Sequence, residues 1–192
     1  MTTDILNCST LFTINNRLIY NAFLADLAPP KIVSESDRNY TETWKRIYSG
    51  IPDGNIREVY YLLLHNKLPV QERKFRIGLV RDPYCLECLG AEIADLEHFF
   101  CDCQKISDIW LWLRRKIESL NSQTLISSNL DILYLILPSP VNEREITWLL
   151  SNYIYFVWDN TFVRDTQTTL EKFFGFLTFK FREQLNGLDE FK

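Results

Sequence analysis

Four cysteines and a histidine lie close together in the middle of this chain, and their spacing constrains the fold more than any other feature. Residues 85–103 read CLECLGAEIADLEHFFCDC. Cys85, Cys88, His98 and Cys103 form the pattern C-x2-C-x9-H-x4-C. Three thiolates and one imidazole complete the tetrahedral shell that Zn²⁺ takes in structural sites, with no position left for water. The spacing therefore predicts a CCHC zinc knuckle with a structural Zn²⁺ ion as its cofactor.

The fourth ligand has two candidates, Cys103 and Cys101. His98 and Cys101 are three residues apart and would share one face of a helix. The step from His98 to Cys103 is longer than one helical turn, so we expect Cys103 near the start of the next helix, whose positive end favours a thiolate. We favour Cys103 and keep Cys101 as its rival. Two other interpretations stay open: reduced buried cysteines without a metal, and a redox C-x2-C pair, although no βαβ pattern accompanies it.

The cysteines and the N-terminus also bear on where the chain resides. Clustered cysteines are typical of metal sites in a reducing compartment, whereas a disulfide scaffold spreads its cysteines along a secreted chain. Residues 1–12 lack the basic start and the apolar run of a signal peptide. Apolar stretches are interrupted within about ten residues, and a membrane span needs roughly 20. We therefore expect an intracellular chain, nuclear or cytoplasmic, that is not secreted and has no membrane partner.

Apolar residues recur mostly at helical spacing, which predicts an all-α fold. Strand signals are weak, and Leu130–Leu137 is too short to assign. We predict an N-terminal helix and linker over 1–40, a zinc-binding domain over 41–120, and a C-terminal helical hairpin over 121–192 that packs on it. The individual helices are expected at 17–27, 41–48, 55–68, 70–79, 106–120, 143–163 and 167–185.

The order of motifs resembles a known family. A Trp-containing helix, TWKRIYSGIP at 43–52, precedes an apolar helix with a basic turn at 60–79. The knuckle DPYCLEC at 82–88 follows, and then DLEHFFCDC at 95–103 and the helix carrying IWLW at 109–112. This stretch resembles the zinc-binding domain that follows the reverse transcriptase in non-LTR (LINE-type) retrotransposons. The resemblance implies that Cys85, Cys88, His98 and Cys103 are the ligands and that the segment supports nucleic-acid handling, here as a stand-alone chain or a polyprotein piece.

Catalytic signatures are missing from the sequence. There is no YxDD-like aspartate pair, no ribonuclease H carboxylate set and no PD-(D/E)xK-like pattern, and 192 residues are too few for a polymerase with several subdomains. The six glycines are too scattered to build a phosphate loop. His65 is the one histidine outside the knuckle, and it sits at a predicted helix end, where a cap or a solvated side chain is the ordinary role. We therefore expect a binding or adaptor module and not an enzyme.

Charge is distributed unevenly along the chain. The net charge of -4, from 21 Lys and Arg against 25 Asp and Glu, argues against coating nucleic acid through bulk charge. Residues 82–102 carry six acids and no Lys or Arg, but basic residues flank them on both sides. If the flanking helices shared one basic face, that face would bind RNA or single-stranded DNA weakly; otherwise these are solvated helix faces. The candidates are Lys67, Arg73, Lys74, Arg76, Arg81, Arg114, Arg115 and Lys116.

The last two predicted helices are rich in aromatic residues, which supports an alternative function. In the final helix Phe173, Phe174 and Phe181 fall on one apolar stripe, together with Leu170, Leu177 and Leu185, whereas Phe176 and Phe179 fall outside it. The two helices carry more apolar surface than a hairpin on a small core needs. The simple explanation is a larger core. The alternative is a groove for a protein partner or a homodimer face, with no nucleic-acid role.

Overall fold

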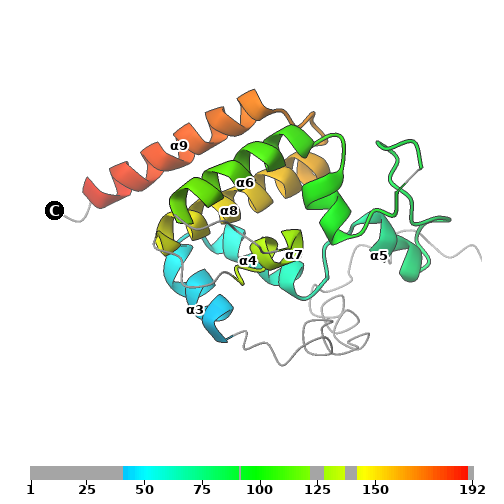
Figure 1. Cartoon of the computed structure of the whole chain (residues 1–192), viewed down its shortest axis with the longest axis horizontal. Coiled ribbons are helices and arrows are strands. Elements are labelled where there is room, and N and C mark those ends of the chain that lie inside the picture. The colour runs from blue at the N-terminus through cyan, green and yellow to red at the C-terminus, as the bar shows by residue number, and fades with distance from the viewer. Residues whose placement is uncertain (1–40, 91, 122–127, 137–141, 190–192) are drawn as a thin grey trace, which may run out of the picture. The chain divides into compact units, whose positions relative to one another are not determined.

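The computed structural model describes residues 41–90, 92–121, 128–136 and 142–189 (Figure 1). All of them belong to one compact unit that spans residues 37–192. They form helices joined by loops, with a single isolated antiparallel bridge between Tyr84 and Ile93, so the predicted all-α class is confirmed. The helix predicted at 17–27 and the segment 1–40 lie outside the described residues. The predicted division at residues 120 and 121 stays a prediction.

The first described pair of helices is α3 (Thr41–Gly50) and α4 (Gly54–Leu64). Asp53 starts α4, because its Oδ1 accepts the N–H of Asn55 at 2.9 Å. His65 ends α4 as its C-terminal cap, which is the structural role expected from its position. Its ring lies 4.2 Å from that of Tyr61, so this histidine belongs to a small aromatic cluster beside α3.

The third described helix, α5 (Gln71–Arg76), is shorter than the predicted helix at 70–79. Gly78 has a φ of 75°, which a glycine adopts without strain, and the N–H of Leu79 bonds to the Lys74 carbonyl at 2.9 Å. Gly78 thus terminates the helix with the left-handed turn common at helix ends. The cysteine-rich segment follows and leads into a π-helical turn, η2 (His98–Asp102), and then into α6 (Ser107–Asn121).

Helix α7 (Asn129–Leu133) resolves the short apolar run that the sequence left unassigned. Ser128 and Asp131 form a capping box at its start: the Ser128 side chain accepts the Asp131 N–H, and the Asp131 side chain accepts the Ser128 N–H. The Leu133 carbonyl at its end accepts a hydrogen bond from the Tyr60 hydroxyl at 2.5 Å. That buried bond ties α7 to α4.

Helix α8 (Glu143–Trp158) is the centre of the core and continues into a second π-helical turn, η3 (Asp159–Val163). It packs against α3, α4, α6 and the final helix, α9 (Leu170–Asp189). Figure 1 shows α6 and α9 running alongside each other over it. No helix among the described residues is both long and apolar enough to cross a membrane.

The apolar stripe predicted for the last helix is partly wrong. Phe173 is fully buried as expected, but Phe176, placed outside the stripe, packs its ring on Tyr155 and Phe156 of α8. Phe174 and Phe181, both placed on the stripe, are exposed. The side of α9 that faces α8 therefore runs through Phe173 and Phe176, whose rings both lie against Phe156.

Candidate metal centre

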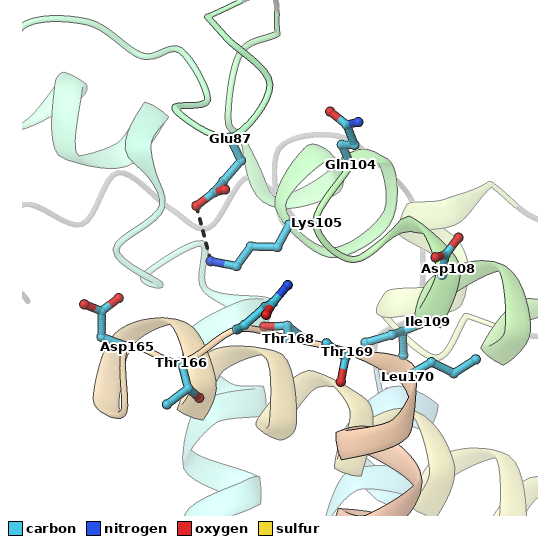
Figure 2. A pocket seen from close by; sticks show the side chains of 11 residues that line it. Glu87, Gln104, Lys105, Asp108, Ile109, Asp165, Thr166, Thr168, Thr169 and Leu170 are labelled. Atoms are coloured by element: carbon cyan, nitrogen blue, oxygen red, sulfur yellow. Dashed lines mark hydrogen bonds and ion pairs between the residues drawn. The ribbon is translucent and has the colours of Figure 1, made fainter.

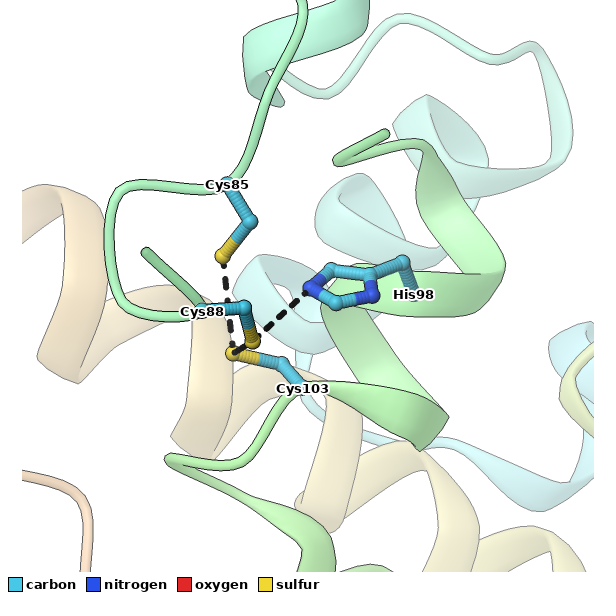
Figure 3. Close-up of side chains that lie close together, drawn as sticks. All are labelled: Cys85, Cys88, His98 and Cys103. Atoms are coloured by element: carbon cyan, nitrogen blue, oxygen red, sulfur yellow. Dashed lines mark hydrogen bonds between the residues drawn. The ribbon is translucent and has the colours of Figure 1, made fainter. Parts of the chain in front are cut away.

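The first two candidate ligands, Cys85 and Cys88, stand on a loop held by a short hairpin. The Cys85 N–H bonds to the Glu92 carbonyl at 2.8 Å, next to the bridge between Tyr84 and Ile93. The Gly90 N–H closes the loop on the Cys85 carbonyl at 3.0 Å. This closed loop brings the two cysteines to the same side of the turn (Figure 3).

His98 and Cys103 are joined by the π-helical turn η2. The Cys103 N–H bonds to the His98 carbonyl at 2.8 Å, five residues back, so one wide turn covers the whole step. We expected the step from His98 to Cys103 to be longer than one helical turn. That holds for an α-helical turn but not for this wider π-helical turn. The Cys103 carbonyl accepts the N–H groups of Ile106 and Ser107, so Cys103 stands at the entry to α6, as predicted.

Asp95 fixes the start of the turn that carries His98. Its Oδ1 accepts the His98 N–H at 2.9 Å, and its carbonyl accepts the Phe99 N–H at 2.9 Å. A carboxylate in this place satisfies backbone donors that a helix start leaves unpaired. The sequence pattern assigns no role to Asp95; the structure makes it the cap that orients the histidine.

The structure brings all four predicted ligand side chains together (Figure 3). The Cys85 and Cys103 sulfurs are 3.8 Å apart, and the Cys88 and Cys103 sulfurs 4.0 Å. The His98 Nε2 is 3.5 Å from the Cys88 sulfur. All four ligand atoms lie within 4.8 Å of one another, with Cys88 alone partly exposed. This group can hold a metal ion.

Cys101, the rival for the fourth place, is buried but lies outside the group of four. Burial raises its pKa, and the nearby carboxylates of Asp102 and Glu97 raise it further. Cys101 is therefore a neutral thiol that fills the core. Burial also raises the pKa of Cys103, to about 12, with the Lys105 N–H opposing the rise and the Cys85 sulfur adding to it. A divalent cation among these sulfurs reverses that balance, because it stabilises each thiolate.

A cleft of about 480 Å³ opens beside His98. Tyr84 and Ile93 supply its apolar lining, and the remaining wall is acidic. Burial raises the pKa of Glu97, and the neighbouring negative charges of Asp102 and Asp95 add to the rise. The acidic lining residues are Glu92, Asp95, Glu97 and Asp102.

A second cleft, of about 600 Å³, lies on another side of the knuckle (Figure 2). It separates the turn before α6 from the loop that leads into α9. Glu87 of the knuckle and Lys105 face each other across one wall in an ion pair of 3.2 Å. Thr168 lines the opposite side with a buried hydroxyl oxygen that has no hydrogen-bond partner in the described part of the chain.

At least four of the eight predicted nucleic-acid-binding residues have their side chains engaged within the protein. Arg73 is buried and donates to the Asn66 carbonyl at 2.9 Å. Lys74 lies over the Phe162 ring, 5.6 Å from its centroid. Two more form ion pairs along their own helices: Arg76 with Glu72 at 2.7 Å, and Arg114 with Glu118 at 3.3 Å.

The other four basic candidates differ in exposure. Arg81, Arg115 and Lys116 are exposed, and Lys67 is half-buried. Figure 1 shows α5 and α6 apart from each other, and the shared basic surface that the sequence suggested stays a prediction. Sequence reasoning did not foresee the internal contacts of these side chains, because contacts such as Lys74 on Phe162 depend on how the helices pack.

Comparison of the chain with protein-family models, with curated proteins and with solved structures gives no match. The arguments about function therefore rest on the chain's own residues.

Proposed function

We propose that this chain is a non-catalytic binding module whose fold is held by a structural Zn²⁺ ion on Cys85, Cys88, His98 and Cys103. The observation that carries the proposal is the spacing of the ligand atoms. With Zn–S bonds of about 2.3 Å and Zn–N bonds of about 2.05 Å, a tetrahedral site has sulfurs about 3.8 Å apart and sulfur–nitrogen pairs about 3.6 Å apart. The observed separations of 3.8, 4.0 and 3.5 Å match those edges.

The donor set supports a structural role for the ion. Three thiolates and one imidazole fill a tetrahedral shell, whereas catalytic zinc keeps a position for water or substrate. Cys85, His98 and Cys103 are buried, which also keeps water from the ion. When bound, Zn²⁺ supplies a cross-link between the hairpin and the turn that opens α6. The protein fixes the geometry of the site in two ways. The Asp95 cap orients His98, and backbone hydrogen bonds hold the Cys85 loop and the turn from His98 to Cys103.

Metal analysis of the purified chain tests this proposal directly. We expect elemental mass spectrometry to find one zinc per chain. Because metal binding and folding are coupled, a strong chelator that removes the zinc should lower both the helical circular dichroism signal and the melting temperature. Adding Zn²⁺ back should restore both. A chain that carries no zinc, and whose melting curve is the same with and without chelator, contradicts the proposal.

The ligand of the module is the second part of the proposal, and a protein partner is the class that the geometry favours. At least four of the eight candidate phosphate-binding side chains are engaged internally, whereas large apolar side chains are exposed, among them Phe174, Phe179 and Phe181 on α9. Light scattering over a range of concentrations tests whether that partner is a second copy of the chain. A strict monomer at high concentration excludes the homodimer through α9.

Weak binding to RNA or single-stranded DNA is the second candidate, in keeping with the resemblance to the zinc-binding domain of non-LTR retrotransposons. Arg115 and Lys116 favour it, since both are exposed on α6 without an ion pair among the described residues. Filter binding at low salt measures it, and affinity should fall steeply as salt rises. Unchanged affinity in an Arg115→Ala, Lys116→Ala double variant argues against this surface.

A further inference from the structure

The loop that carries Cys85 and Cys88 exposes apolar side chains. Leu86 is 79 % exposed and Leu89 is 97 % exposed. Tyr84 and Ile93, paired across the hairpin below them, are about half exposed. We call these four residues the knuckle surface. Single exposed apolar residues are common on proteins and need no explanation. A group of them on one short loop, by contrast, is typical of an interaction site.

Leu89 is the least expected residue of the four. Its φ is 55°, in the left-handed region where glycine and asparagine are comfortable and a leucine side chain crowds its own backbone. A leucine so exposed contributes nothing to the core. Neither the fold nor the backbone therefore accounts for leucine at this position. A residue held in a disfavoured conformation points to a function that its side chain performs outside the fold.

The acids near the knuckle surface gather on its Tyr84 and Ile93 side, whereas Leu86 borders a different cleft that Lys74 and Lys105 also line. Between Asp82 and Gln104 the sequence has no Lys or Arg. Tyr84 and Ile93 share their cleft with Glu92, Asp95 and two further acids. The nearest cation of the next segment, Lys105, is paired with Glu87 at 3.2 Å. A phosphate backbone is repelled by such a rim, whereas lysine and arginine side chains are attracted to it.

We propose that the knuckle surface docks a basic segment of a protein partner, in which apolar side chains pack on Leu86 and Leu89 while flanking Lys or Arg side chains meet the acidic rim. An apolar centre surrounded by complementary charge is the arrangement found at protein interfaces, where a few buried side chains supply most of the affinity. The proposal rests on the proposed zinc function, because the ion holds the loop in one conformation and thereby lowers the entropy cost of binding.

Two synthetic peptides of equal length serve as probes. Both carry leucines at helical spacing, and the positions between them are all Lys in one peptide and all Glu in the other. Fluorescence anisotropy with the zinc-loaded full chain should show binding of the Lys peptide and none of the Glu peptide. Leu89→Gly should weaken binding roughly tenfold to a hundredfold, the value of one buried leucine. Leu111→Gln on α6, which alters a half-exposed leucine away from the knuckle, should leave binding unchanged.

Each of several outcomes overturns the proposal: neither peptide binds, the Glu peptide binds as well as the Lys peptide, or Leu89→Gly binds as tightly as the unaltered chain. Displacement of the Lys peptide from the knuckle surface by a single-stranded oligonucleotide also overturns it, in favour of nucleic acid. Zinc content and melting temperature are measured on the same samples. If zinc is present and peptide binding is absent, this inference fails while the zinc function stands; if zinc is absent, the proposed function itself fails.

Discussion

The hydroxyl of Tyr153 on α8 donates a hydrogen bond to the backbone carbonyl of Phe100, in the middle of the turn that carries His98 and Cys103. Tyr153 is fully buried, and burial holds its pKa well above the usual range, so the hydroxyl keeps its proton and remains a donor. Phe100 is fully buried too. The central helix of the core thus fastens the half of the metal centre that these two ligands occupy.

Tyr153→Phe should therefore affect both stability and metal affinity. The variant leaves the Phe100 carbonyl buried without its partner, which costs about 1–3 kcal/mol of unfolding free energy. Because the turn is loosened, a competing chelator should also remove zinc at a lower concentration. Tyr60→Phe is the matched control: it removes a buried hydroxyl that bonds the Leu133 carbonyl, away from the ligands. Equal loss of zinc affinity in both variants would show that Tyr153 acts through global stability alone.

Cys103 and Cys101 should behave differently when altered. Cys103→Ser removes one of three sulfur ligands, so the cobalt-substituted protein should lose part of its sulfur-to-metal charge-transfer absorption and bind zinc more weakly. Cys101→Ala removes a buried thiol outside the cluster, and it should lower stability by about 1 kcal/mol with the cobalt spectrum unchanged. A spectrum altered by Cys101→Ala and preserved in Cys103→Ser would reverse the assignment of the fourth ligand.

Asp95→Ala should destabilise the start of the His98 turn. Loss of this cap costs about 1 kcal/mol, because the His98 N–H then lacks its acceptor. Asp95→Asn keeps a side-chain oxygen that can accept the same hydrogen bond, and it should retain most of the stability. Thermal melts of the three zinc-loaded proteins measure the difference. If the Asn variant is as unstable as the Ala variant, the carboxylate charge matters more than the cap.

The Asp53–Lys180 contact predicts a small acid-dependent loss of stability. Partial burial raises the pKa of Asp53, but the Lys180 ammonium at 3.0 Å and the Asn55 N–H together lower it below the usual value. A lowered pKa stabilises the fold above the unfolded value of about 3.9, and that stabilisation is lost as pH falls through the folded value. The pair is partly exposed, so the expected effect is below about 1 kcal/mol. The measurement is the unfolding free energy of Asp53→Asn and of the unaltered chain, followed down to about pH 3. The difference between the two isolates the contribution of Asp53, because protonation of the zinc ligands affects both proteins alike.

The sequence predicted those parts of the molecule that depend on local spacing. The four candidate ligands that the structure brings together follow from C-x2-C-x9-H-x4-C, and the helices around Trp44 and Trp110 follow from apolar periodicity. The wide turn between His98 and Cys103 did not follow, because its bond pattern is rare and the Tyr153 hydroxyl that bonds to it comes from a distant helix. The inward position of Phe176 and the burial of Arg73 were missed for the same reason. Each depends on packing between helices, which periodicity within one helix does not encode.

The unequal anchoring of the four ligands has a consequence for the redox chemistry of the centre. His98 and Cys103 belong to a turn fastened to α8, whereas Cys88 sits on the exposed loop and is the one residue of the four that is not buried. Oxidants and thiol-alkylating reagents should therefore attack Cys88 before its neighbours, since a bound thiolate reacts where it is accessible. Losing that one sulfur leaves the metal ion with three ligands, so the ion should dissociate. The loop that carries Cys88 should then lose its fixed conformation while the helical core remains folded. The knuckle would then be the first part of the protein to lose its structure under oxidative stress.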